Sequence, residues 1–108
     1  MKEISITSFE NLKIGQAENS VAGTGCTVFL LGKSGAPAGL DVRGGGPASR
    51  ESELLHPLAA AQAIHAIVLA GGSAFGLDAA GGVMQSMISA LMSASQKFHS
   101  FVRLICLI

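Results

Sequence analysis

The sequence has few of the residues that mark specialised protein classes. It contains no Trp, no Tyr and only two Cys, and neither Cys26 nor Cys106 belongs to a CxxC pair. This pattern excludes a disulfide scaffold, and no His stands at ligand spacing from either cysteine. We therefore expect reduced thiols, with Cys26 as a buried strand residue, and we expect no metal or other cofactor.

Charged residues are also scarce, at 13% of the chain, and seven Lys and Arg balance seven Asp and Glu. Without a basic block the chain is not expected to bind nucleic acid. The longest uncharged stretch, residues 79–96, includes Gly, Gln and Ser and falls short of the ~20 apolar residues of a membrane span. The first residues, MKEISI, are too polar for a secretory signal. The sequence thus predicts a cytoplasmic protein that does not enter membranes.

Hydrophobic residues make up 49% of the chain, enough for a single core in a protein of this size. The composition changes near Met84. Residues 1–84 hold all seven acidic residues and five of the seven basic ones, whereas residues 85–108 hold only Lys97 and Arg103 and no Gly. We therefore divide the chain into a domain at 1–84 and a divergent apolar tail at 85–108.

Glycines and prolines separate short apolar segments within residues 1–84. Three of these favour strands of an antiparallel meander: 12–18, 26–31 and 38–43. The stretch GGGPASRESELLHP predicts an irregular loop with one helical turn, capped by Ser49 or Ser52 and followed by Pro57. After it we expect a helix-prone segment at 58–64, a fully buried strand at 66–69, and a helix from Ser73 to about Ser95.

The junction AIVLAGGSAFGLDAAGGVM runs from a strand through two glycines into a helix, and three chemistries use such a turn. A helix N-terminus can bind an anion, although neither GxGxxG nor a P-loop is present. A nucleophile elbow, G-x-S-x-G, would expose Ser73, but Phe75 replaces the last glycine. The reading that we favour is structural: Gly71 and Gly72 let the helix start close to the sheet, and Ser73 caps it.

The loop VRGGGPASRE concentrates charge around a glycine run that includes Gly44 and Gly45. An Arg can bind a carboxylate through two parallel hydrogen bonds, and a Glu can hold an amine. An internal ion pair of Glu51 with Arg43 or Arg50 that orders the loop is the reading that we favour. His56 and His65 have no Ser or acid at catalytic spacing, so we read them as a helix-end His and a half-buried strand His.

Three ordered blocks of the sequence resemble a known family. They are GTGCTVFLL at 23–31, AGLDVRGGGPASRESELL at 38–55 and HAIVLAGGSAFGLDAAGGVM at 65–84, and LKIGQAEN at 12–19 resembles the family's first strand. The family is that of the DmpA-like peptidases, family S58, which includes L-aminopeptidase/D-esterases, β-peptidyl aminopeptidases and nylon-oligomer hydrolases. The resemblance covers about residues 10–84.

The resemblance implies an α/β (α+β) fold: an N-terminal fragment of a DmpA-like αββα sandwich, with a β meander followed by a strand, a Gly-Gly turn and a helix. It also implies a precursor that cuts itself, so that a freed N-terminal Ser or Thr becomes the nucleophile with its own α-amino group as base. That nucleophile and the family's oxyanion Asn lie beyond the last matched position. The resemblance therefore carries no catalytic residue into this chain. The matched blocks supply only pocket-lining or scaffold candidates: Arg43, Gly44, Gly45, Arg50, Glu51, Gly71, Gly72 and Ser73.

The expected function is that of an N-terminal, α-subunit-like fragment of an S58 aminopeptidase or amide hydrolase, inactive alone. The alternative is a non-catalytic module that binds a small anion or assembles with other chains on the same scaffold. Expected partners are a peptide or amide substrate in the intact family, the missing C-terminal half or an intact relative, and further copies of the chain. We hypothesise that residues 85–108 arise from a shifted frame or a truncation, and that their apolar side chains fold back onto exposed surface.

Overall fold

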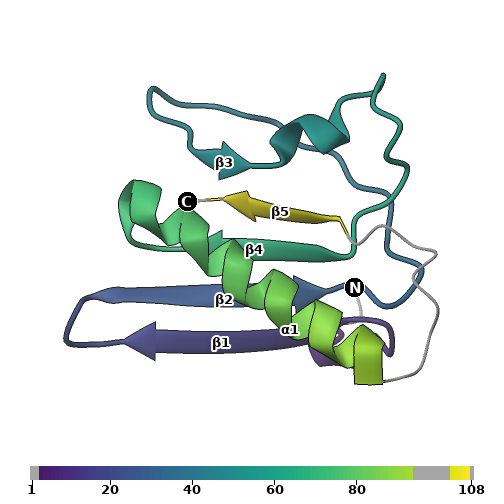
Figure 1. Cartoon of the computed structure of the whole chain (residues 1–108), viewed down its shortest axis with the longest axis horizontal. Coiled ribbons are helices and arrows are strands. Elements are labelled where there is room, and N and C mark those ends of the chain that lie inside the picture. The colour runs from purple at the N-terminus through teal and green to yellow at the C-terminus, as the bar shows by residue number, and fades with distance from the viewer. Residues whose placement is uncertain (1–2, 94–102, 108) are drawn as a thin grey trace.

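The computed structural model describes residues 3–93 and 103–107. One five-stranded sheet with the strand order β1-β2-β4-β5-β3 carries a single long helix, α1, on one face (Figure 1). A mixed sheet with a covering helix is an α/β fold, as the sequence predicted. A short 3-10 turn, η1 (Ile6–Ser8), precedes the first strand.

The first two strands form a hairpin. β1 (Lys13–Asn19) pairs antiparallel with β2 (Thr24–Leu30), with Gly15 opposite Val28. The Asn19 side chain closes the turn, because its Oδ1 accepts hydrogen bonds from the backbone N–H groups of Val21 at 3.1 Å and Ala22 at 3.0 Å. Both of these predicted strands are confirmed.

The third predicted strand of the meander, residues 38–43, is wrong. That segment has no regular structure, and the place beside β2 is taken by β4 (Ala66–Ala70), which runs antiparallel to β2. The five residues of β4 are all aliphatic, so they gain more from a central position than a segment that contains Gly39, Asp41 and Arg43.

β4, the helical segment and β5 form a β-α-β unit. The chain leaves β4 through η3 (Ser73–Asp78), continues as α1 (Ala79–Ser93), and returns as β5 (Leu104–Leu107) parallel to β4. The predicted helix is confirmed in position, although its first six residues form a 3-10 helix. Its predicted end near Ser95 lies outside the described residues.

The described part of the tail folds back, as expected, but as a strand inside the sheet. β5 lies between β4 and the two-residue β3 (Ser49–Arg50). Four further tail residues that were expected to cover apolar surface lie outside the described residues: Phe98, Phe101, Val102 and Ile108.

The core lies between the sheet and α1. Alternate residues of β4 and β5 face the helix, and Val68 and Cys106 are fully buried there. Met84 and Met87 of α1 pack against them. The remaining buried members of this cluster are Ala66, Ala70, Ala80 and Leu104. Small residues on both β4 and α1 let the helix lie close to the strands.

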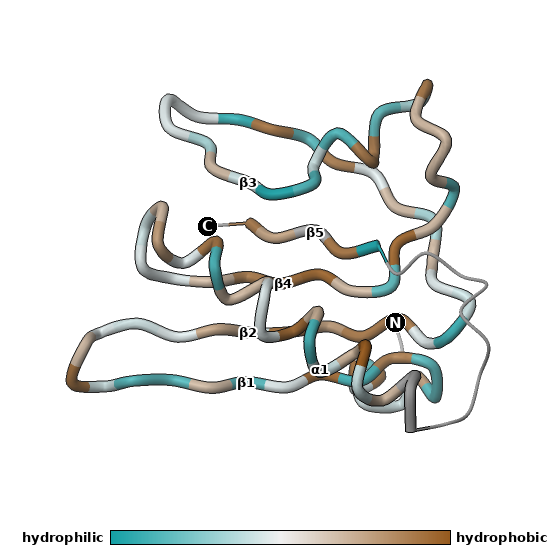
Figure 2. The backbone as a smooth tube through the Cα atoms, in the orientation of Figure 1, coloured by the Kyte–Doolittle hydropathy of each residue, from teal (hydrophilic) through white to brown (hydrophobic). Residues whose placement is uncertain are grey.

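The opposite face of the sheet is apolar and open. Leu69 of β4 remains 43% exposed and Ile14 of β1 36% exposed, and Figure 2 shows apolar segments along β2, β4 and β5. The prediction of a fully buried strand at 66–69 is therefore wrong, because no described residues cover this face. The chain exposes 8054 Å², against about 5,600 Å² expected for a compact protein of its mass.

Two further local predictions need correction. Residues 58–63 are not helical, because an Ala-rich stretch this short cannot hold a helix by propensity alone. Ile64 and Ala36 instead exchange two backbone hydrogen bonds, at 3.0 and 2.8 Å. The predicted helical turn is confirmed as η2 (Ser52–Leu55), but no side chain caps it. The Ser49 hydroxyl donates to the Ser52 hydroxyl instead, at 2.8 Å.

Candidate functional site

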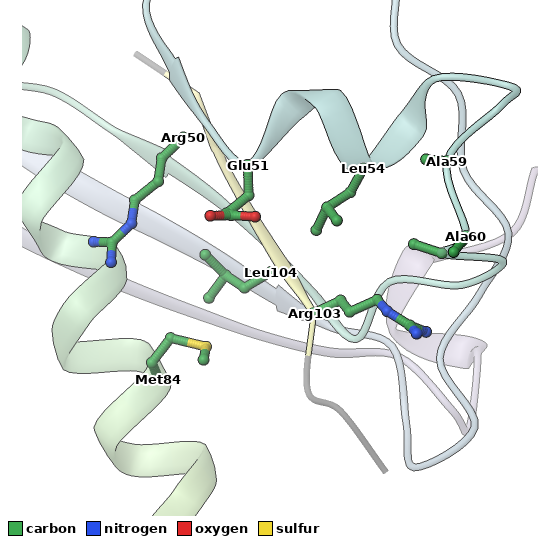
Figure 3. A pocket seen from close by; sticks show the side chains of 9 residues that line it. Arg50, Glu51, Leu54, Ala59, Ala60, Met84, Arg103 and Leu104 are labelled. Carbon is green, nitrogen blue, oxygen red and sulfur yellow. The ribbon is translucent and has the colours of Figure 1, made fainter.

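A cavity of about 550 Å³ opens between the β3–η2 segment, the edge strand region of β5 and helix α1 (Figure 3). It combines three charged side chains with a mostly aliphatic wall. Its lining residues are Arg50, Glu51, Leu54, Ala59, Ala60, Ala61, Met84, Arg103 and Leu104.

Arg50 is placed by β3. The strand pairs Arg50 with Cys106 across the ladder to β5, so both side chains stand on the face that α1 covers. Burial raises the pKa of the Cys106 thiol, as does the charge of Cys26, while the Arg50 guanidinium acts in the opposite direction. Arg50 is thus near enough to Cys106 for its positive charge to be felt at the base of the sheet.

Glu51 occupies an unusual backbone conformation. Its φ of 63° and ψ of 19° lie in the left-handed region, and it stands at the N-cap position of η2. A non-glycine residue costs roughly 1–2 kcal/mol there. The turn directs the chain from β3 into η2 and brings Glu51 and Leu54 to the same cavity.

The predicted internal ion pair of Glu51 is wrong. Among residues 3–93 and 103–107 the one ion pair joins Arg43 to Asp41, with Nε 2.6 Å from Oδ2, on the exposed surface. The short loop Asp41-Val42-Arg43 lets Arg43 satisfy its charge locally. Figure 3 shows the Arg50 guanidinium extending toward α1, away from the Glu51 carboxylate.

Arg103 enters the cavity through a contact with a buried histidine. The His65 N–H donates to the Arg103 carbonyl oxygen at 2.7 Å, and His65 Nδ1 accepts a hydrogen bond from the Arg103 N–H at 3.3 Å. His65 is buried, so it holds the backbone at the start of β5 while the Arg103 side chain lines the cavity. His56 also accepts locally, from the Leu58 N–H at 3.2 Å.

The Gly-Gly turn lies outside this cavity, at the end of β4. The Gly71 N–H donates to the Gly25 carbonyl oxygen at 2.8 Å, and a Cβ on Gly71 would stand 3.0 Å from Thr24 Oγ1. Gly72 has a φ of 104°. Close approach of helix and sheet therefore requires both glycines, as the structural interpretation predicted.

The predicted cap by Ser73 is wrong. Ser73 has a φ of 55° and Gly72 holds the N-cap position, with no side-chain cap hydrogen bond. The positive φ gives Ser73 the strained backbone of an elbow. In the described part of the chain, however, no hydrogen bond links its hydroxyl to a histidine.

Of the eight candidates from the sequence, Arg50 and Glu51 line the cavity. Gly44 and Gly45 belong to the exposed loop after Arg43. In Figure 1 this loop and the Gly-Gly turn lie toward the same end of the sheet, where β4 and β5 end. Sequence reasoning missed Arg103, which reaches the cavity only because β5 joins the sheet. A strand, a helix and the aliphatic run LICL formed a recognisable β-α-β pattern that could have found it.

Metal chemistry finds little support in this arrangement: across residues 3–93 and 103–107, no three His, Cys, Asp or Glu side chains are grouped to hold an ion. None of the described helices is long and apolar enough to cross a membrane.

The family model of peptidase family S58 matches residues 5–107. The chain belongs to peptidase family S58. The matched range runs through β5, so it includes most of the segment at 85–108 that the sequence analysis separated as a tail. The boundary near Met84 and the origin of that tail stay predictions.

Curated relatives of this S58 chain are named uncharacterized aminopeptidases. One from Mycobacterium tuberculosis is 39% identical over 88 residues, which cover 75% of this chain and 26% of the relative. One from Mycobacterium leprae is also 39% identical over 88 residues, covering 75% of this chain and 24% of the relative. The matched part of the chain spans about a quarter of the length of these relatives.

Proposed function

We propose that this S58 chain forms part of the substrate pocket of an aminopeptidase or amide hydrolase and does not hydrolyse peptides by itself. The match to the S58 family model and the names of the curated relatives support the hydrolase class. The carrying observation for inactivity is that no Ser, Thr or Cys side chain in the described residues is hydrogen-bonded to a histidine.

In this proposal the reaction is that of an N-terminal nucleophile hydrolase. A Ser or Thr freed by self-cleavage attacks the substrate carbonyl, and its own α-amino group accepts the hydroxyl proton. That nucleophile comes from sequence outside the matched blocks. The present chain contributes an α-subunit-like wall, in which Leu54, Met84 and Leu104 exclude water and Arg50, Glu51 and Arg103 supply charge.

A complementation assay tests the proposal. The chain would be produced with the region of the Mycobacterium tuberculosis relative that lies beyond the matched residues, and release of p-nitroaniline from aminoacyl anilides would be measured. We expect no release by either polypeptide alone and release by the pair. A pair that remains inactive although the two polypeptides co-purify would contradict the proposal.

A second candidate function is a non-catalytic module that binds a small anion. The observation in its favour is a cavity bordered by Arg50 and Arg103, neither of which forms an ion pair with a described residue. Phosphate at 100 times its dissociation constant would raise the unfolding free energy by about 2.7 kcal/mol. Thermal unfolding that is insensitive to phosphate and to acetate would exclude this function.

We place the protein in the cytoplasm as part of the same proposal. Both Cys26 and Cys106 are free thiols, which fits a reducing compartment. Fluorescence of a tagged chain in fractionated cells would test this placement, and recovery outside the cytoplasmic fraction would refute it.

A further inference from the structure

We propose that the cavity between β3, η2, α1 and β5 binds an unblocked, dipeptide-sized zwitterion, with its ammonium group at Glu51 and its carboxylate at Arg103. The inference names a ligand class for the proposed function and rests on it. Binding is measured on the chain alone, so it can hold or fail separately from hydrolysis.

The first argument is the state of the charges. Arg50, Glu51 and Arg103 border one cavity, yet none of them is in an ion pair within the described residues. Arg43, by contrast, binds Asp41 on the open surface. Two positive groups and one negative group that face the same cavity leave hydrogen-bonding capacity for a ligand that carries both signs.

The second argument is the placement of these groups. Figure 3 shows the guanidinium groups of Arg50 and Arg103 directed to opposite sides, with the Glu51 carboxylate and Leu104 between them. One compact anion therefore cannot be held by both arginines at once. A ligand with separated ends can place its ammonium group at Glu51 and its carboxylate at Arg103.

The third argument explains why Arg103, and not Arg50, takes the carboxylate. Two hydrogen bonds to buried His65 fix the backbone of Arg103, at 2.7 and 3.3 Å. A fixed backbone lowers the entropy lost when the guanidinium orders around a carboxylate. Arg50 belongs to an exposed two-residue strand and acts on the Cys106 side of the cavity.

The fourth argument is the wall between the charged ends. Leu54, Ala60 and Leu104 line it, and Leu104 is buried. A cavity of about 550 Å³ lies within the range of roughly 300–1,000 Å³ that holds small ligands. Small aliphatic side chains favour a ligand with a short apolar body.

The test is isothermal titration of the chain with alanyl-leucine, N-acetyl-alanyl-leucine and alanyl-leucinamide. We expect saturable binding of the free dipeptide at millimolar concentration, and about tenfold weaker binding when either end is blocked, since each block removes a charge-assisted hydrogen bond. Equal affinity for all three peptides, or no saturable binding of the free dipeptide, would overturn the proposal.

Variants assign the two ends. Arg103→Gln should abolish the preference for carboxylate over amide, and Glu51→Gln should abolish the preference for a free over an acetylated amine. Lys33→Gln and Glu53→Gln remove exposed charges outside the cavity and should bind like the parent chain. If Arg50→Gln abolishes the carboxylate preference and Arg103→Gln does not, the assignment is wrong.

Circular dichroism distinguishes lost binding from lost folding in these variants. Should Arg103→Gln unfold, Arg103→Lys keeps the charge and lacks the planar fork, so it should retain part of the carboxylate preference. Binding of the free dipeptide with no hydrolysis by the complemented pair would refute the proposed function alone. Hydrolysis without a carboxylate preference would refute this inference alone.

Discussion

Two adjacent residues of β4 test the one-sided burial of the sheet. Val68 is fully buried beneath α1, whereas Leu69, on the opposite face, remains 43% exposed. We compare Val68→Lys with Leu69→Lys. The two variants place the same side chain on the same strand, so β propensity and net charge change alike, and only the face differs.

The expected magnitudes follow from these exposures. Val68→Lys loses about 1.5–3 kcal/mol of burial and forces an ammonium group into the core, which costs several kcal/mol more. The sum reaches the ~5–15 kcal/mol that holds a whole domain together. Leu69→Lys loses roughly half the burial of a leucine, about 1 kcal/mol, and the Lys stem recovers part of it by lying along the apolar face.

Urea unfolding followed by far-ultraviolet circular dichroism measures both variants. We expect Val68→Lys to be unfolded without urea, and Leu69→Lys to unfold cooperatively with a midpoint slightly below that of the parent chain. The reasoning is refuted if Leu69→Lys is unfolded while Val68→Lys keeps the parent midpoint, or if both variants behave alike.

Three other predictions follow from the described residues. Gly35→Ala should lower the unfolding free energy by at least about 2 kcal/mol, because Gly35 has a φ of 68° and a Cβ would stand 2.6 Å from the Ile64 carbonyl oxygen, whereas Gly39→Ala, with open space around it, should change little; equal urea midpoints would contradict this. Cys106 is buried with a raised thiol pKa, so iodoacetamide should alkylate partly exposed Cys26 first at mildly alkaline pH. Folded Cys106 holds its proton more tightly than the unfolded chain does, so its contribution to stability is complete below the ordinary thiol pKa and is lost as the pH rises through the raised value; mass spectrometry showing Cys106 modified first would be inconsistent with both statements. The open sheet face should cause self-association, so light scattering should report a mass above 10.9 kDa that falls toward the monomer in Leu69→Lys, and a parent chain that stays monomeric at high concentration would count against it.

The sequence predicted the elements whose signals are local. The hairpin strands, β4 and the helix each show an apolar period between glycines, and all four are present. The exchange of residues 38–43 for β4 beside β2 could not be predicted locally, because two segments compete for one strand edge and the outcome depends on total burial. The Ala-rich residues 58–63 failed for a similar reason, since the bridge between Ile64 and Ala36 outweighs a weak helix propensity.

The site was predictable in part. Arg50 and Glu51 attracted attention as charges in a glycine-rich loop, and both line the cavity. Their independence from each other was not predictable, because it depends on the left-handed backbone of Glu51. Arg103 was missed because its place depends on the parallel pairing of β5 with β4, a contact between segments far apart in the sequence.

Release of p-nitroaniline from aminoacyl anilides by the purified, mass-verified chain alone tests the central claim most directly. The account predicts a rate equal to the buffer background, because a polypeptide with a pocket wall but no activated nucleophile cannot form an acyl intermediate. Steady release above background that scales with protein concentration and disappears in Ser73→Ala would place the reactive group within these residues and contradict the account.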